Sequence, residues 1–164
     1  MKYQKISYEY LLPKIDKPSR YIGLELNAEK KQMDENKVNF CLAFPDVYEV
    51  GITHLGLKIL YTVLNSEEDT VADRTYAPWP DFAEMMREHD IPLFSLENKV
   101  ALKEFDIIGF TLQSELNFSN VLYMLKLANI ELLSEDRAEN DPIIIGGGPS
   151  ISNPEPLADF FDAI

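Results

Sequence analysis

Two hydrophobic patterns alternate along the chain from residue 38 onward. Segments with apolar residues spaced three and four apart predict helices over 53–65, 81–89, 117–130 and, in a shorter form, 154–161. Between them, short runs predict strands, most of them almost continuously apolar: 38–44 (VNFCLAF), 70–78 (TVADRTYAP), 105–112 (FDIIGFTL) and 142–148 (PIIIGGG). Apolar strands that alternate with helices indicate a parallel sheet covered on both faces.

This order of elements predicts the fold class. We expect an α/β protein with a doubly wound parallel sheet, a Rossmann-like three-layer sandwich of flavodoxin-like strand order 2-1-3-4-5. The fifth strand should begin at about Ala163 and be truncated, and the apolar end of the sequence suggests a fragment of a longer chain. Residues 1–37, with Pro13 and Pro18 and the polar stretch NAEKKQMDENK, are expected to form an N-terminal arm and linker, and residues 38–164 the domain.

Helical spacing also predicts which side chains share a face. In the helix over 81–89, Met85 and Met86 should point toward the core. In the helix over 53–65, one apolar face should hold Leu55, Ile59, Leu60, Val63 and Leu64.

Charge and composition narrow the classes of function. The 164 residues carry a formal net charge of −13, which argues against direct binding of nucleic acid by this segment, because phosphate contacts need clustered Lys and Arg. No run reaches the length of a membrane span and the N-terminus lacks a signal-peptide core, so we expect a cytoplasmic protein without membrane contact. The single cysteine, Cys41, lies within a predicted strand and is expected to be a buried structural thiol.

Chemistry is expected where three loops meet at the carboxyl ends of the strands. In doubly wound sheets, ligands bind there, at the point where the strand order reverses. The loops are 45–56 (PDVYEVGITHLG), 111–117 (TLQSELN) and 146–150 (GGGPS). The candidate cofactor-binding residues are Asp46, Tyr48, Glu49, Gly51, Thr111, Gln113, Ser114, Gly146, Gly147 and Gly148.

Each loop also has a purely structural interpretation. The glycines can simply form a turn, and the polar residues after Thr111 can cap the next helix. His54 has no metal-ligating partner at a suitable spacing and is expected to make a structural hydrogen bond. No Ser-His-Asp or Cys-His grouping can be assembled, so we assign no catalytic residue and no metal ligand to this segment.

The three loops resemble a known ligand-binding pattern. Cobalamin-binding domains of the flavodoxin-like type have Asp-x-His-x-x-Gly after the first strand, a short Ser-containing element at the third and Gly-Gly at the fourth. The chain has Asp46 and Gly51 at that spacing with Tyr48 in place of the histidine, then Thr111 to Gln113, then Gly146-Gly147. A phenol is a poorer cobalt ligand than an imidazole.

Longer phrases resemble the N-terminal region of cobalamin-domain radical S-adenosylmethionine (SAM) proteins. They are PSRYIGLELN (18–27), FPDVYEVGITHLGLKILY (44–61), APWPDF (77–82), PLFSLE (92–97) and IIIGGGPSISNPEPLADFFDA (143–163). The resemblance implies an accessory domain that presents cobalamin or substrate to a downstream radical domain of the same chain. The 4Fe–4S cluster and SAM would be bound in that downstream domain.

Two alternatives stay open at this point. The segment can be an interaction or structural module of the same fold that no longer binds cobalamin. Binding of a flavin or nucleotide at the same edge is less favoured, because no phosphate-binding loop follows the first strand. The fragment itself is not expected to be catalytic, whereas its parent protein is expected to be a radical SAM enzyme.

Overall fold

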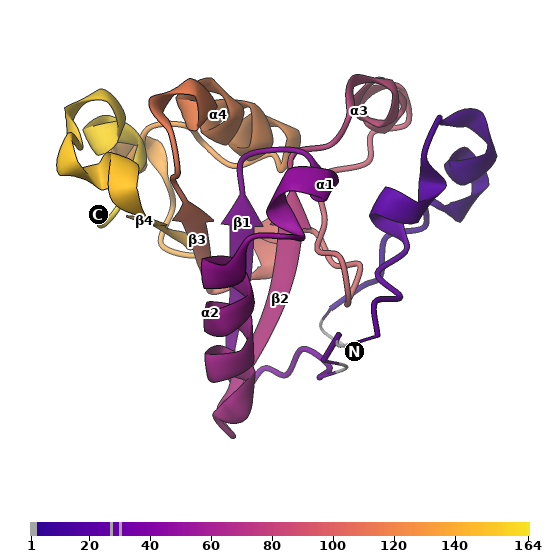
Figure 1. Ribbon diagram of the computed structural model, residues 1–164, viewed down its shortest axis with the longest axis horizontal. Coiled ribbons are helices and arrows are strands. Elements are labelled where there is room, and N and C mark those ends of the chain that lie inside the picture. Colours follow the sequence, from indigo (N-terminus) through magenta and orange to yellow (C-terminus); the bar gives the residue numbers. More distant parts are fainter. Residues whose placement is uncertain (1–2, 27, 30) are drawn as a thin grey trace.

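The computed structural model describes residues 3–26, 28, 29 and 31–164. Its sheet consists of four parallel strands in the order β2-β1-β3-β4: β1 (Val38–Phe44), β2 (Thr70–Tyr76), β3 (Ile107–Thr111) and β4 (Ile143–Gly147) (Figure 1). The predicted α/β class and the first four positions of the predicted strand order are confirmed. At the place of the expected fifth strand, Ala163 makes a single parallel bridge to Ile145, so the described residues hold four strands rather than five.

Helical segments connect the strands. The α-helices are α1 (Tyr48–Gly51), α2 (Leu55–Ser66), α3 (Pro80–Glu88) and α4 (Phe118–Leu127). Short 3₁₀ helices cover Glu9–Lys14, Pro18–Tyr21, Leu102–Glu104, Glu115–Asn117, Ser134–Asp136, Pro149–Ser152 and Glu155–Phe160. Within the described part of the chain, no helix is long and apolar enough to cross a membrane.

The central strand β1 contributes apolar side chains to both faces of the sheet. Cys41 and Ala43 belong to a large apolar cluster that also contains residues of α3 and α4. Leu42 and Phe44 belong to a smaller cluster with residues of α2 and β2. This alternation follows from the two-residue repeat of a strand, and it places α2 opposite α3 and α4.

Helix α2 buries a different face from the predicted one. Leu55, Ile59, Leu60 and Val63 are between 48% and 69% exposed, and Leu64 is only half-buried. The buried residues are Leu57, Tyr61 and Asn65. The prediction is wrong because α2 is apolar around most of its circumference. Its orientation is set by packing on β2, where the Asn65 side chain exchanges two hydrogen bonds with the backbone of Ala72.

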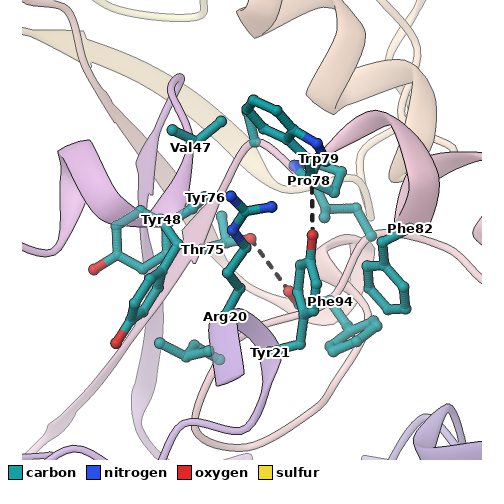
Figure 2. Close-up of a pocket in the computed structure, with 13 residues that line it drawn as sticks. Arg20, Tyr21, Val47, Tyr48, Thr75, Tyr76, Pro78, Trp79, Phe82 and Phe94 are labelled. Atoms are coloured by element: carbon teal, nitrogen blue, oxygen red, sulfur yellow. Dashed lines mark hydrogen bonds between the residues drawn. The ribbon is translucent and has the colours of Figure 1, made fainter. Parts of the chain in front are cut away.

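The N-terminal arm packs against the domain. Tyr8, Leu11 and Ile15 are buried in the large apolar cluster, so part of the core lies before residue 38. Farther along the arm, the Tyr21 hydroxyl accepts the backbone N–H of Trp79 at 3.1 Å (Figure 2). The expected division into an arm (1–37) and a domain (38–164) stays a prediction, and residues 27 and 30 of the polar connector lie outside the described residues.

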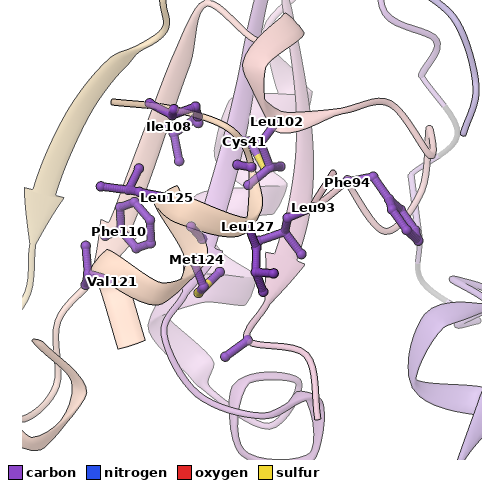
Figure 3. Packing of buried hydrophobic residues seen from close by; sticks show 14 of the residues in the cluster. Cys41, Leu93, Phe94, Leu102, Ile108, Phe110, Val121, Met124, Leu125 and Leu127 are labelled. Atoms are coloured by element: carbon purple, nitrogen blue, oxygen red, sulfur yellow. The ribbon is translucent and has the colours of Figure 1, made fainter. Parts of the chain in front are cut away.

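The core between the sheet and α4 is apolar and closely packed (Figure 3). Ile108 and Phe110 of β3 face Met124 of α4, and all three side chains are at most 2% exposed. Cys41 is fully buried in this cluster, which confirms the expected structural thiol. Met86 is also fully buried, as predicted, whereas its neighbour Met85 is half-buried and packs at the edge of the cluster.

Candidate functional site

A groove of about 450 Å³ lies between α2 and the uncovered part of the sheet. Its volume is within the range typical of small-molecule sites. It runs along the sheet face that bears α2 and ends at the carboxyl edge of β3 and β4. Its lining combines glycines with apolar side chains: Phe40, Leu42, His54, Gly56, Leu60, Leu64, Gly109, Phe110, Thr111, Gln113, Ile145, Gly146, Gly147 and Gly148.

Five of the ten candidate residues line this groove together. Thr111 ends β3 and Gln113 comes shortly after it, while Gly146 and Gly147 end β4 and Gly148 follows. They meet because parallel strands present their carboxyl ends at one edge of the sheet. Their role in binding a ligand stays a prediction.

Gly147 and Gly148 differ in what they contribute. A Cβ added at Gly148, where φ is +121°, would lie 2.4 Å from the carbonyl oxygen of Leu112, so this glycine is required by the turn itself. A Cβ added at Gly147 would meet no heavy atom within 4 Å. Gly147 is therefore the position where the backbone is open to a ligand.

Ser114 has a structural role in the second loop. Its hydroxyl accepts the N–H of Leu116 at 3.3 Å and caps the short 3₁₀ helix Glu115–Asn117. It does not line the groove. The capping interpretation of the polar residues after β3 therefore holds for this serine.

The first loop contributes only His54 and Gly56 to the groove, and its four candidate residues Asp46, Tyr48, Glu49 and Gly51 do not line it. Asp46 accepts the N–H of Val47 at 2.7 Å and the side-chain amide of Asn117 at 3.3 Å, which ties the first loop to the second. Glu49 pairs with Arg20 and Lys17 of the arm, and the hydrogen bond from Arg20 lowers the pKa of this carboxyl. These two carboxylates hold the loop in place.

Gly51 allows two buried elements to approach closely. It is buried at the end of α1, and a Cβ there would lie 2.4 Å from two ring carbons of Tyr76. The glycine of the Asp-x-Tyr-x-x-Gly motif is thus explained by packing against β2.

Tyr48 is covered by the arm. Its hydroxyl donates to Glu25 at 2.8 Å. Its ring packs edge-on against Tyr76, with the ring centroids 5.4 Å apart (Figure 2). Burial, followed by the hydrogen bond to Glu25, raises the pKa of Tyr48 to about 12, so the phenol is neutral. A neutral phenol that is already bonded to a carboxylate does not fit the role of a cobalt ligand.

His54 lines the groove and also has a structural role. Its Nδ1 accepts the N–H of Leu57 at 3.1 Å, so the imidazole caps α2, as the expected structural hydrogen bond requires. Because Nδ1 is an acceptor, the neutral ring carries its proton on Nε2. The sequence pattern alone predicts no ligand role for His54 or Gly109. The signal for Gly109 is a glycine inside a strand, where it leaves room for the Phe40 ring.

A buried polar cluster that the sequence pattern does not predict lies at β2. Asp73 and Arg74 are adjacent, buried and charged, and Arg74 pairs with Glu97 and with Glu25 of the arm. Among the described residues, no group of three or more His, Cys, Asp or Glu side chains is placed to hold a metal ion.

The fold and groove place the chain among doubly wound α/β domains of flavodoxin-like architecture, a class that binds ligands at the carboxyl edge of its sheet. Within that class, residues 56–164 match the family described as "Radical SAM proteins, N-terminal", and the chain belongs to this family.

The chain is also similar to a longer curated protein. It is 27% identical over 127 residues to the uncharacterized protein MJ0966 of Methanocaldococcus jannaschii. The match covers 76% of this chain but only 22% of that relative. No solved structure matches the chain.

Proposed function

We propose that this chain is the accessory N-terminal domain of a radical SAM enzyme and that it positions a cofactor or substrate in the groove beside α2. A radical domain elsewhere in the same polypeptide would bind the 4Fe–4S cluster and SAM and perform the chemistry. The observation that carries the proposal is the glycine-lined groove at the carboxyl edge of β3 and β4, in a member of this family.

Cobalamin is the first candidate ligand of the groove. The open backbone at Gly147 would allow close approach of a slender part of the ligand, and Thr111 and Gln113 would offer polar groups at the mouth. When bound, cobalamin would supply a redox-active cobalt to the radical domain. This chain would hold it without a protein ligand to cobalt, because Tyr48 is bonded to Glu25.

A titration with hydroxocobalamin tests this assignment. We expect a change in the visible spectrum of the purified chain and retention of the pigment on gel filtration. In the matched variant Gly147→Leu, the new side chain would enter the groove from a position with no neighbour within 4 Å, and binding should be lost without loss of fold. Leu116→Ala, at an exposed position outside the groove, should bind normally. No retained pigment at high micromolar concentration, or equal retention by Gly147→Leu, would contradict cobalamin binding.

The second candidate function is a cofactor-free interaction module. The observation that favours it is the contact between the arm and Tyr48. Tyr48 stands where the cobalamin-binding motif has its histidine, and its hydroxyl is already bonded to Glu25 of the arm. In this case the melting temperature should not respond to cobalamin, flavin or nucleotides. A ligand present at 100 times its Kd adds about 2.7 kcal/mol to stability, a change that a thermal melt detects readily.

A further inference from the structure

Arg74 lies at the centre of a buried polar site beneath the arm. Its guanidinium packs 4.5 Å from the centroid of the Tyr61 ring, and the side chain is 6% exposed. The Nε atom donates to Glu97 at 3.0 Å, and Nη2 bonds both Glu97 and Glu25. A buried guanidinium needs a charged partner, because an unpaired buried charge is strongly unfavourable.

Glu97 does not supply that charge. Burial, followed by the neighbouring Asp73 carboxylate, raises the pKa of Glu97 to about 10, so Glu97 carries a proton at neutral pH. Asp73 remains ionised, but its oxygens are already engaged by four N–H groups, from the backbone of Arg74, Glu97 and Asn98 and from the Asn98 side chain. Glu25 is the other carboxylate in contact with the guanidinium, and the arm supplies it.

Glu25 reaches this site from a part of the arm that we call the strap, residues 17–26, and it follows the short 3₁₀ helix Pro18–Tyr21. Its two neighbours, Leu24 and Leu26, are 80% and 103% exposed, whereas the Glu25 carboxylate is directed inward and contacts both Arg74 and Tyr48. The strap thus inserts one acidic side chain and leaves its apolar neighbours in solvent.

A further donor of the site lacks a partner. Tyr76 is only 8% exposed, and its buried hydroxyl makes no hydrogen bond to any described residue. Its ring lies against Tyr48, and its hydroxyl interacts electrostatically with both Arg74 and Glu25. An unsatisfied buried hydroxyl is unusual and costs stability.

We propose that Arg74, Tyr48 and Tyr76 form a carboxylate-binding site, and that Glu25 is its internal ligand. When the strap lifts, the site accepts the carboxylate of a bound small molecule, and the Tyr76 hydroxyl is the spare donor for it. The strap is then a gate in which Glu25 competes with that molecule. This site is separate from the groove, so its test is independent of the proposed function.

Chemical rescue tests the proposal on the whole 164-residue chain. Glu25→Ala empties the site, and sodium acetate is the probe, with sodium chloride at equal ionic strength as the reference. At ten times its Kd, acetate lowers the unfolding constant about elevenfold. We therefore expect the melting temperature of Glu25→Ala to rise by about 3–6 °C more in acetate than in chloride.

Matched variants separate this site from general salt effects. Glu29→Ala removes another carboxylate close to the strap. Glu29 bonds the Tyr61 hydroxyl only through its backbone, and the variant keeps those hydrogen bonds. Its melting temperature should respond to acetate no more than that of the wild type does. Adding Tyr48→Phe to Glu25→Ala removes one donor and should weaken acetate binding about tenfold. If Glu25→Ala does not fold, Glu25→Gln keeps the shape of the side chain but removes its charge and one of its two acceptor oxygens. Acetate should displace this weaker internal ligand more easily, so Glu25→Gln must still respond more than the wild type. An equal response of all variants, or no response of the Glu25 variants, would overturn the proposal.

Discussion

The substitution Gly51→Ala tests whether this glycine serves packing. An added Cβ would lie 2.4 Å from two carbons of the Tyr76 ring and 3.1 Å from the Phe44 ring. The first of these distances is about 1 Å inside ordinary contact. Tyr76 cannot easily move away, because it is 8% exposed and its ring packs against Tyr48.

The expected magnitude follows from two opposing terms. Overpacking a buried contact costs roughly 1–3 kcal/mol. Alanine is favoured over glycine in a helix by up to about 1 kcal/mol, and Gly51 is the last residue of α1. We expect a net loss of about 1–2 kcal/mol, which for a chain of this length lowers the melting temperature by about 2–8 °C.

Urea unfolding followed by circular dichroism measures the effect. Gly147→Ala is the matched control, since its Cβ meets nothing within 4 Å, and its stability should stay within about 0.5 kcal/mol of the wild type. In the Tyr76→Leu background, Gly51→Ala should cost much less, because the ring that it strikes is gone. A Gly51→Ala protein as stable as the wild type would refute the packing argument.

Three further predictions concern other positions. Gly148→Ala should destabilise the fold by roughly 1–3 kcal/mol in urea unfolding, because φ is +121° and the Cβ would strike the Leu112 carbonyl; an unchanged midpoint would contradict this. Burial and the neighbouring Asp73 carboxylate raise the pKa of Glu97 in the folded state to about 10. The contribution of this protonated carboxyl to the stability of the fold is therefore complete below the pKa that Glu97 has in the unfolded chain, and it is lost as the pH rises toward 10. Relative to the wild type, the free energy of unfolding of Glu97→Gln should therefore increase by up to about 1.4 kcal/mol per pH unit between pH 5 and 9. A difference in stability that does not change with pH would show that Glu97 is ionised. The Cys41 thiol is fully buried, which raises its pKa, so we expect a thiol reagent to label it no faster than the chain unfolds, whereas labelling in seconds under native conditions would contradict the packing.

Most of the fold could be predicted from the sequence because the strands are locally encoded. The run 38–44 is apolar at nearly every position, as a central parallel strand buried on both faces must be. The convergence of Thr111 and Gly147 follows from topology alone, since both end parallel strands of one sheet. These features depend on local pattern and on strand order, which the chain displays directly.

The orientation of α2 and the surroundings of Tyr48 could not be predicted in this way. The pattern of α2 offers apolar residues on several faces, so tertiary packing selects Leu57 and Tyr61. The partner of Tyr48 is Glu25, 23 residues earlier, in an arm whose path no periodicity describes. Burial of Arg74 likewise involves that arm, because the Glu25 carboxylate that the arm supplies pairs with the buried guanidinium.

The contacts of the arm also constrain the order in which the protein can become structured during synthesis. The carbonyl of Tyr21 binds the ammonium of Lys99, 78 residues later, and Ile6 donates its N–H to the carbonyl of Lys99. The arm therefore leaves the ribosome well before the segment that holds it, and such distant pairings form slowly. In the nascent chain the apolar side chains of the arm stay exposed until residue 99 has emerged, which is the interval in which a chaperone would bind them.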